Sequence, residues 1–199
     1  MKIILGGTSK KEFVEVIKGN GWGRMLTPQR RFKIFDMEPY AIDNGAFYCW
    51  RNGSNFDEVA FLKTIDFSLT LHKPYLAILP DIVAGGNKSL DFSMSWIDRL
   101  PDYNWYLAVQ DGMDSARVVD CIDMVSGLFL GGSDRFKRTG PYWCKLAHHN
   151  FKLFHYGRAG TYSKLQHAYQ CGADSLDSAF PLWTKQRFKE FQTWVELIP

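Results

Sequence analysis

The chain has 199 residues, of which 46% are hydrophobic and 23% are charged, and its formal net charge at pH 7 is +3. These values are ordinary for a globular protein, and the length suits one domain, residues 1–199, with a sizeable core. No apolar run approaches the roughly 20 residues that span a bilayer, and the apolar N-terminal segment is too short for a signal peptide. We therefore expect a cytoplasmic protein with no membrane partner.

The cysteines and histidines do not have the spacing of a metal site. Cys49, Cys121, Cys144 and Cys171 are widely separated, and His148–His149 is an adjacent pair rather than a helically spaced one. We expect free thiols, no metal and no cofactor.

Eight short apolar segments have the length and composition of strands that are buried on both faces. In chain order they are residues 2–6, 32–36, 40–44, 75–80, 105–110, 127–131, 151–156 and 174–177. Helical patterns occupy residues 9–18, 56–72, 88–99, 114–125, 141–149, 162–171 and 184–197. This alternation predicts an α/β fold, a compact (β/α)8 barrel of the TIM type. Because the second and third strands leave no room for a helix between them, an open doubly wound sheet is the alternative.

Four of these segments end in an acid or an amide that a turn or a helix follows. They end at Asp43, Asp81, Gln110 and Asp177. Polar groups at the carboxyl ends of parallel strands form the active sites of such barrels. One carboxylate in a turn is more often a helix cap, but four similar ends predict a shared site.

Basic and aromatic residues lie together after the sixth strand, where Arg135, Lys137 and Arg138 neighbour Tyr142 and Trp143. This combination suits phosphate contacts and base stacking. We expect the three basic side chains to lie on a loop that grips a nucleic-acid backbone. A solvated loop with scattered charges is the alternative.

Six segments occur in an order that is known from one enzyme family. They are Asp43–Phe47, Asp81, Val109–Gly112, Gly131–Gly132, Tyr156–Gly160 and Asp174–Ser178. Together they resemble the motifs of the tRNA-guanine transglycosylases, which are β/α barrels. The likeness is greatest to the short branch that acts on DNA and inserts 7-deazaguanine bases into phage or bacterial DNA.

The resemblance implies an exchange of guanine in DNA for a 7-deazaguanine base. Asp177 would be the nucleophile that expels guanine and holds the sugar covalently until the incoming base displaces it. Asp43 would be the general acid and base of both steps, and an Asx-turn with Gly45 is the alternative for this residue. Asp174, three residues before Asp177, would face the other side of the strand.

The remaining motifs would bind the base. Asp81 would accept hydrogen bonds from the guanine N1–H and exocyclic amine, and Gln110 would contact the O6 and N7 side. The backbone amides of Gly131 and Gly132 would approach the base because no Cβ blocks them.

Two aromatic rings, Phe47 and Tyr156, would sandwich the base, and core packing is the alternative for both. In duplex DNA the target base would first have to be flipped out of the stack, at a cost of a few kcal/mol.

The chain also departs from the family. Ser178 replaces a cysteine, Leu182 and Trp183 replace a threonine and an arginine, and no zinc-binding subdomain follows. We therefore expect DNA rather than tRNA as the partner, in the host cytoplasm if the chain is phage-encoded. The loss of that subdomain is also compatible with an oligomer or with a partner subunit that helps to hold the nucleic acid. The functional alternatives are a DNA glycosylase or nucleoside hydrolase with the same acids, a non-catalytic nucleic-acid-binding barrel, and an unrelated barrel enzyme with a phosphorylated substrate.

Overall fold

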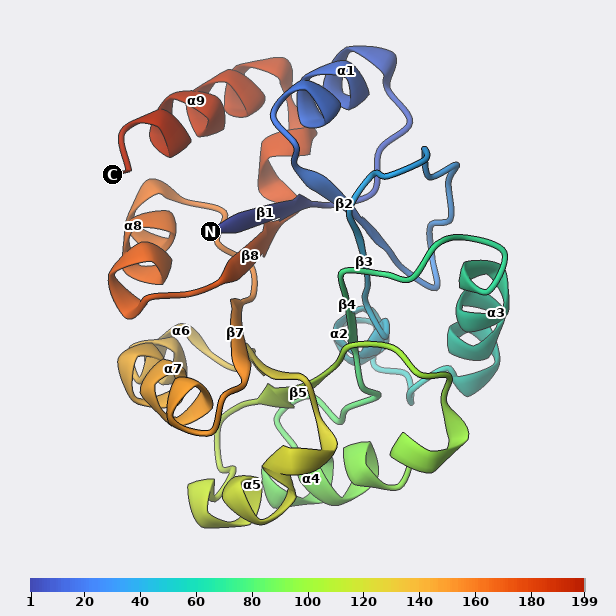
Figure 1. The fold of residues 1–199 in the computed structure, drawn as a ribbon, viewed down its shortest axis with the longest axis vertical. Helices are drawn as coiled ribbons and strands as arrows, with labels where there is room; N and C mark the ends of the chain where they lie inside the picture. Colours follow the sequence, from blue (N-terminus) through green and yellow to red (C-terminus); the bar gives the residue numbers. More distant parts are fainter. Residues whose placement is uncertain (199) are drawn as a thin grey trace.

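The computed structural model describes residues 1–198 and is a closed barrel of eight parallel strands in the order β1 to β8. Each strand pairs with the next one along the chain, and β8 pairs with β1, where Asp177 lies opposite Ile4. The helices form an outer ring around the strands (Figure 1). The predicted (β/α)8 barrel is therefore confirmed.

The strands are short. They are β1 (Lys2–Leu5), β2 (Gly23–Leu26), β3 (Tyr40–Ile42), β4 (Leu76–Ile78), β5 (Trp105–Val109), β6 (Gly127–Leu130), β7 (Leu153–Tyr156) and β8 (Ser175–Ser178). The helices are α1 (Lys11–Gly19), α2 (Ala46–Arg51), α3 (Glu58–Ser68), α4 (Asn87–Met94), α5 (Ser115–Cys121), α6 (Asp134–Lys137), α7 (Gly140–His149), α8 (Tyr162–Cys171) and α9 (Lys185–Glu196). Three 3₁₀ helices lie at Ile97–Arg99, Ile122–Met124 and Phe180–Trp183.

The second strand is not where the apolar pattern predicts it, at residues 32–36, but at β2. Arg24 within β2 is buried, and its guanidinium donates to both carboxylate oxygens of Glu38, at 2.5 and 2.7 Å. The Phe32 ring lies 4.3 Å from the guanidinium carbon. Arg24 thus interrupts the apolar pattern of β2, where the strand lies. Phe32, from the segment predicted to be the strand, packs over the Arg24 guanidinium instead.

Residues 27–39 contain no helix, but the close spacing of the second and third strands that we expected is not the reason, because β2 ends at Leu26 and β3 begins at Tyr40. The pattern predicts neither α2 nor α6, which have only six and four residues and are too short for a helical period. Figure 1 shows α2 closer to the centre of the barrel than the other helices. None of the helices within residues 1–198 is both long and apolar enough to cross a bilayer.

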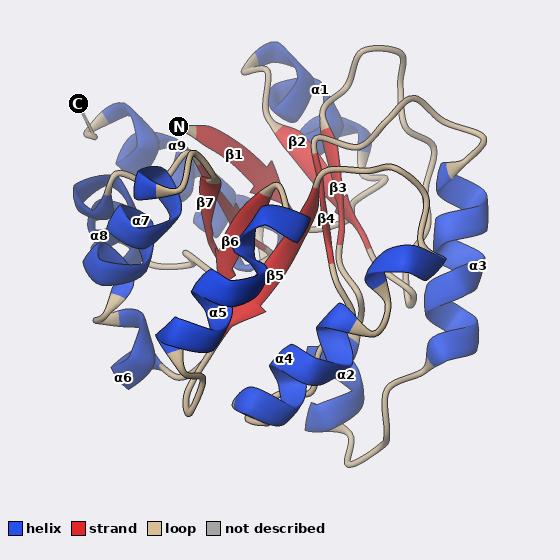
Figure 2. Cartoon of the chain, turned by 60° about the horizontal axis from the view of Figure 1, so that its bottom comes forward, coloured by secondary structure: helices blue, strands red, loops and turns tan. Residues whose placement is uncertain are grey.

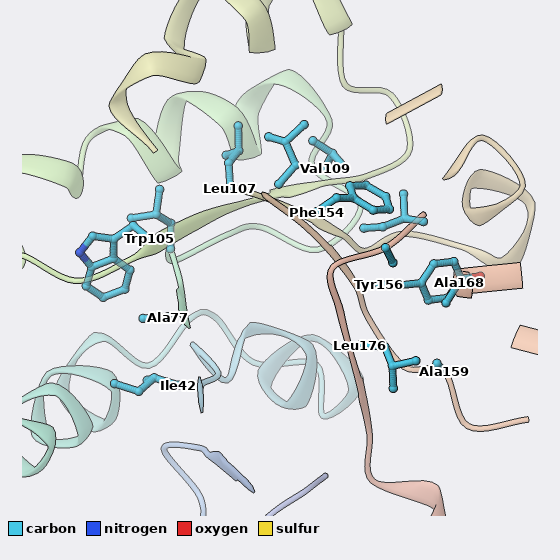
Figure 3. Close-up of a cluster of buried hydrophobic side chains, with 14 of the residues drawn as sticks. Ile42, Ala77, Trp105, Leu107, Val109, Phe154, Tyr156, Ala159, Ala168 and Leu176 are labelled. Atoms are coloured by element: carbon cyan, nitrogen blue, oxygen red, sulfur yellow. The ribbon is translucent and has the colours of Figure 1, made fainter. Parts of the chain in front are cut away.

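The apolar side chains form two layers, one on each side of the strands. The inner cluster fills the barrel and consists of Ile4, Met25, Ala41, Leu76, Ile78, Tyr106 and Ala108. Helices surround the strands (Figure 2), and the outer cluster packs between the two. Figure 3 shows part of this cluster, including Leu107, Val109 and Leu176. Successive residues of a strand alternate between the two layers, so the layers identify which polar residues face the barrel axis.

Candidate active site

Three carboxylates lie together at the carboxyl end of the barrel. Asp43 directly follows β3, Asp81 follows β4 after two residues, and Asp177 lies near the end of β8. Because all the strands run in parallel, these three positions meet at one rim of the barrel. The electrostatic effects agree with this placement, since the charge of Asp177 raises the pKa of Asp43 and the charge of Asp43 raises that of Asp81. The structure therefore brings together the three acids that the sequence singles out.

Asp43 is partly buried, and this burial raises its pKa to about 6. The Gly45 N–H, which donates to Asp43 Oδ1 at 2.6 Å, and the Arg158 charge act in the opposite direction. The Asx-turn that is the alternative interpretation of Asp43 is thus present. Gly45 has φ +82°, and a Cβ there would lie 2.8 Å from Pro28. A tight turn therefore holds one oxygen of a carboxyl group that titrates near neutral pH.

Asp81 is held by two side-chain amides. Asn44 Nδ2 donates to its Oδ1 at 2.7 Å, and Gln110 Nε2 lies 3.2 Å from its Oδ2. Burial raises the pKa of Asp81 to about 6, against the effect of these two hydrogen bonds. Asn44 also donates to the Leu79 carbonyl oxygen at 2.6 Å, so it joins the end of β3 to that of β4.

Gln110 is only 2% exposed, and its hydrogen-bonding groups are already engaged. Its Oε1 accepts from the Ala84 N–H at 2.6 Å, and its Nε2 reaches Ser89 Oγ at 2.8 Å and the Ile82 carbonyl oxygen at 3.0 Å. The structure therefore places Gln110 beneath Asp81, as a support, rather than facing a ligand.

Asp177 has protein hydrogen bonds on one oxygen. His155 Nε2 and the Arg158 N–H each lie 3.1 Å from its Oδ1, and no described residue hydrogen-bonds to its Oδ2. Asp174 has a different environment, since its Oδ2 accepts from the Phe154 N–H at 2.7 Å and lies 2.9 Å from His148 Nε2. The two acids have separate environments, in accord with the prediction that they face opposite sides.

Arg158 crosses the mouth of the barrel from the loop after β7. Its guanidinium lies 4.6 Å from the centre of the Phe47 ring on α2, and it donates to the Gly132 carbonyl oxygen at 2.6 Å. Phe47 is 39% exposed. Arg158 has φ +56°, a left-handed conformation that is uncommon for residues with a Cβ. The side chain thus covers the ring that we expect to stack on a base.

The two glycines after β6 have distinct roles. Gly131 donates its N–H to the Val109 carbonyl oxygen at 2.9 Å, so the sheet already uses this amide. Gly132 has φ +70°, and a Cβ there would lie 2.6 Å from Asp111 Oδ2. This turn requires glycine for its conformation and for the close approach of Asp111.

Tyr156 does not lie at the mouth, contrary to the predicted base sandwich. It is 2% exposed and belongs to the outer layer, where its hydroxyl lies 3.2 Å from His167 Nδ1 of α8. Figure 3 shows it among the outer-layer side chains, with Ala159 and Ala168. The alternative of core packing is the correct one for Tyr156, because alternation along β7 turns its ring outward.

The predicted basic loop is partly helical, and one of its three basic side chains is buried. Lys137 ends α6, is 2% exposed and donates to the Gly157 carbonyl oxygen. Burial, with a further contribution from the Arg158 charge, lowers the pKa of Lys137 to about 7. Lys137 is therefore not available to contact a phosphate, contrary to the prediction, whereas Arg135 and Arg138 are exposed.

An open groove of about 470 Å³ lies beside α6 and the start of α7. Arg138, Phe136, Tyr142 and Trp143 are among its lining residues, and it contains none of the three acids. Within residues 1–198, no group of His, Cys, Asp and Glu side chains is arranged to hold a metal ion.

Sequence reasoning missed three residues of this site, which are Asn44, His155 and Arg158. All three lie in or beside segments that the sequence singles out, but their roles depend on contacts between strands. The alternation of β7 contained a usable signal, because His155 lies between the apolar residues Phe154 and Tyr156 and therefore faces inward with Asp177.

Fold and geometry define an α/β barrel with a cluster of acids at the carboxyl ends of its strands. No protein-family model and no curated protein matches the chain.

Proposed function

We propose that the chain is a DNA-guanine transglycosylase, which replaces guanine in DNA by a 7-deazaguanine base through a covalent intermediate on Asp177. The observation that carries this proposal is the contrast among the three acids. Asp177 is anchored by two donors on one oxygen, whereas burial raises the pKa values of Asp43 and Asp81 to about 6. Base exchange needs both kinds of carboxyl group, a fixed nucleophile and a group that exchanges protons near neutral pH.

In the first step, Asp177 Oδ2 attacks the sugar C1′. The bond from C1′ to the guanine nitrogen breaks, and its electron pair leaves with guanine. Protonated Asp43 gives its proton to the leaving base. The products are free guanine, a glycosyl ester of Asp177 and an Asp43 carboxylate, so atoms and charge balance. The anion also stabilises the oxocarbenium-like transition state before the bond to C1′ forms.

In the second step, the incoming 7-deazaguanine gives its ring N–H proton to the Asp43 carboxylate and attacks C1′. The ester bond breaks, and its electron pair returns to Asp177. Two displacements retain the configuration at C1′ and restore both acids. A pKa near 6 suits Asp43 because it must donate the proton in one step and accept it in the other.

Asp81 and Phe47 would bind the base. Each oxygen of Asp81 accepts one hydrogen bond from the protein, which leaves lone pairs for the N1–H and exocyclic amine of guanine. The Arg158 guanidinium covers one face of the Phe47 ring, so a base that stacks on that face would displace it. In this proposal Arg158 therefore moves when a base enters.

The groove beside α6 and α7 would receive the DNA backbone next to a flipped base. Arg138 and Tyr142 line it, and Arg135 is exposed nearby on α6. A cationic and aromatic groove suits phosphate contact and stacking.

The test is incorporation of labelled guanine, and of a labelled 7-deazaguanine, into duplex DNA, single-stranded DNA and tRNA in parallel. The proposal predicts incorporation into DNA that Asp177→Ala and Asp43→Ala abolish and that Asp174→Asn preserves. Release of guanine with abasic sites and no incorporation would instead indicate a glycosylase. Incorporation by Asp177→Ala would rule out the proposed mechanism.

A further inference from the structure

We propose that His155 is a positioning residue, which holds Asp177 so that Oδ2 alone faces the sugar. The catalytic meaning of this inference rests on the proposed function, whereas the hydrogen-bond pattern that it assigns can be tested without turnover.

His155 is fixed inside the barrel. It is 0% exposed, and its ring stacks on Phe129 with the ring centres 5.1 Å apart and the planes inclined by 14°. The Tyr106 ring meets it edge-on at 6.5 Å. Bulky apolar side chains usually fill the interior of such a barrel. A buried imidazole between two aromatic rings is therefore an unusual side chain for the interior of a barrel.

Both ring nitrogens have partners on the neighbouring strand β8. Nε2 lies 3.1 Å from Asp177 Oδ1, and Nδ1 lies 2.8 Å from Ser175 Oγ. Asp177 Oδ1 also accepts from the Arg158 N–H at 3.1 Å, so this oxygen is an acceptor. His155 then carries a proton on Nε2, and in the neutral imidazole Nδ1 accepts the hydroxyl proton of Ser175. Ser175 thus selects the tautomer that donates to Asp177.

The three residues have the composition of a Ser–His–Asp triad, but the arrangement excludes a nucleophilic serine. Ser175 is 0% exposed, inside the barrel, and two residues before Asp177 on the same strand. The group nearer the mouth is Asp177. The usual roles are therefore reversed, and the serine orients the histidine while the carboxylate meets the substrate.

This geometry makes the two oxygens of Asp177 unequal. Oδ1 has two N–H donors, whereas no described residue hydrogen-bonds to Oδ2. The donors on Oδ1 restrict rotation of the carboxylate and leave Oδ2 as the attacking oxygen. Loss of the His155 donor would free that rotation, and we expect kcat to fall while KM changes little.

The activity test compares His155→Phe with His155→Gln. Phenylalanine keeps a ring that can stack on Phe129 but has no hydrogen-bond donor. The kcat for base exchange should therefore fall on the order of 10²-fold, which is the usual cost of losing one preorganised donor. Glutamine places an amide N–H near the former Nε2 and should recover part of the loss. Tyr106→Phe is the matched control, because its buried hydroxyl has no hydrogen-bond partner among the described residues. Equal losses in His155→Phe and His155→Gln, or none in either, would overturn the inference.

The second test needs no turnover. Long-range ¹H–¹⁵N NMR of the folded wild-type protein should show His155 as the neutral Nε2–H tautomer. Ser175→Ala should make the two tautomers more equal, and Tyr106→Phe should not. An unprotonated Nε2 in the wild type would overturn the inference even if base exchange occurs. If the wild type exchanges no base in any nucleic acid, the proposed function fails, while the tautomer still decides whether His155 donates to Asp177.

Discussion

The two sides of the barrel mouth place aspartate side chains in different environments. On the side of β3 and β4, Asp43 and Asp81 are partly buried near each other, and burial raises the pKa of each to about 6. On the side of β7 and β8, Asp177 receives two N–H donors on one oxygen. The difference shows how one barrel can hold carboxyl groups that exchange protons beside one that is held in a fixed orientation.

The largest expected effect comes from removing the anchored acid. Asp177→Ala should lower base exchange by about 10⁴-fold or more, because it removes the nucleophile itself. Exchange of labelled guanine into DNA measures this. Asp174→Asn is the matched control, since Asp174 lies on the same stretch of chain but contacts His148 and the Phe154 N–H. Equal losses in both variants would remove the distinction between the two acids.

Asp43→Asn tests the opposite side of the mouth, and should lower exchange by about 10²- to 10⁴-fold, the usual worth of a general acid or base. The same change should stabilise the protein at high pH. The pKa of Asp43 is raised from 3.8 to about 6, so the folded state loses stability as the pH rises between these values. At pH 8 the variant should gain about 2–3 kcal/mol of unfolding free energy.

Urea unfolding at pH 8 and pH 4 measures that gain. It should be much smaller at pH 4, because Asp43 is then protonated in the folded state and partly protonated in the unfolded state, whose pKa is 3.8. A gain that does not depend on pH would mean that the charge of Asp43 is not its source.

Base binding should depend on the ionisation of Asp81. Its pKa is about 6, so affinity for free guanine should be constant above that pH and fall about tenfold for each unit below it, as the acceptor is protonated. Calorimetry between pH 5 and 8 measures this. Because the Asp43 charge raises the pKa of Asp81, Asp43→Asn should move the midpoint to lower pH. An unchanged midpoint would contradict coupling between the two acids.

The smallest effects concern DNA affinity. Arg135→Gln with Arg138→Gln should reduce the salt dependence of DNA binding by about 2 in slope, if each side chain contacts one phosphate. Lys137→Met should leave the slope unchanged, because Lys137 is buried on the Gly157 carbonyl oxygen. A reduced slope for Lys137→Met as well as for the arginine pair would restore the original prediction, in which all three basic side chains contact phosphates.

The sequence predicts the barrel well because most strands are apolar on both faces and end in visible turns. It predicts β2 wrongly because Arg24 is buried there with Glu38, an ion pair that local pattern does not reveal. The acids are found because they end apolar runs. The burial of Lys137 against the Gly157 carbonyl oxygen and the contact of His155 with Asp177 arise from tertiary packing, which residue spacing alone does not specify. The outward turn of Tyr156 follows from the alternation of β7 and is available from the sequence.

The most direct measurement is of the covalent intermediate itself. The protein would be mixed with guanine-containing DNA without an incoming base, quenched in acid, digested and analysed by mass spectrometry. We predict a DNA adduct, with guanine lost, on the peptide that contains Asp177. It should be absent in Asp177→Ala and present in Asp174→Asn. An adduct on another residue, or base exchange by Asp177→Ala, would contradict the account.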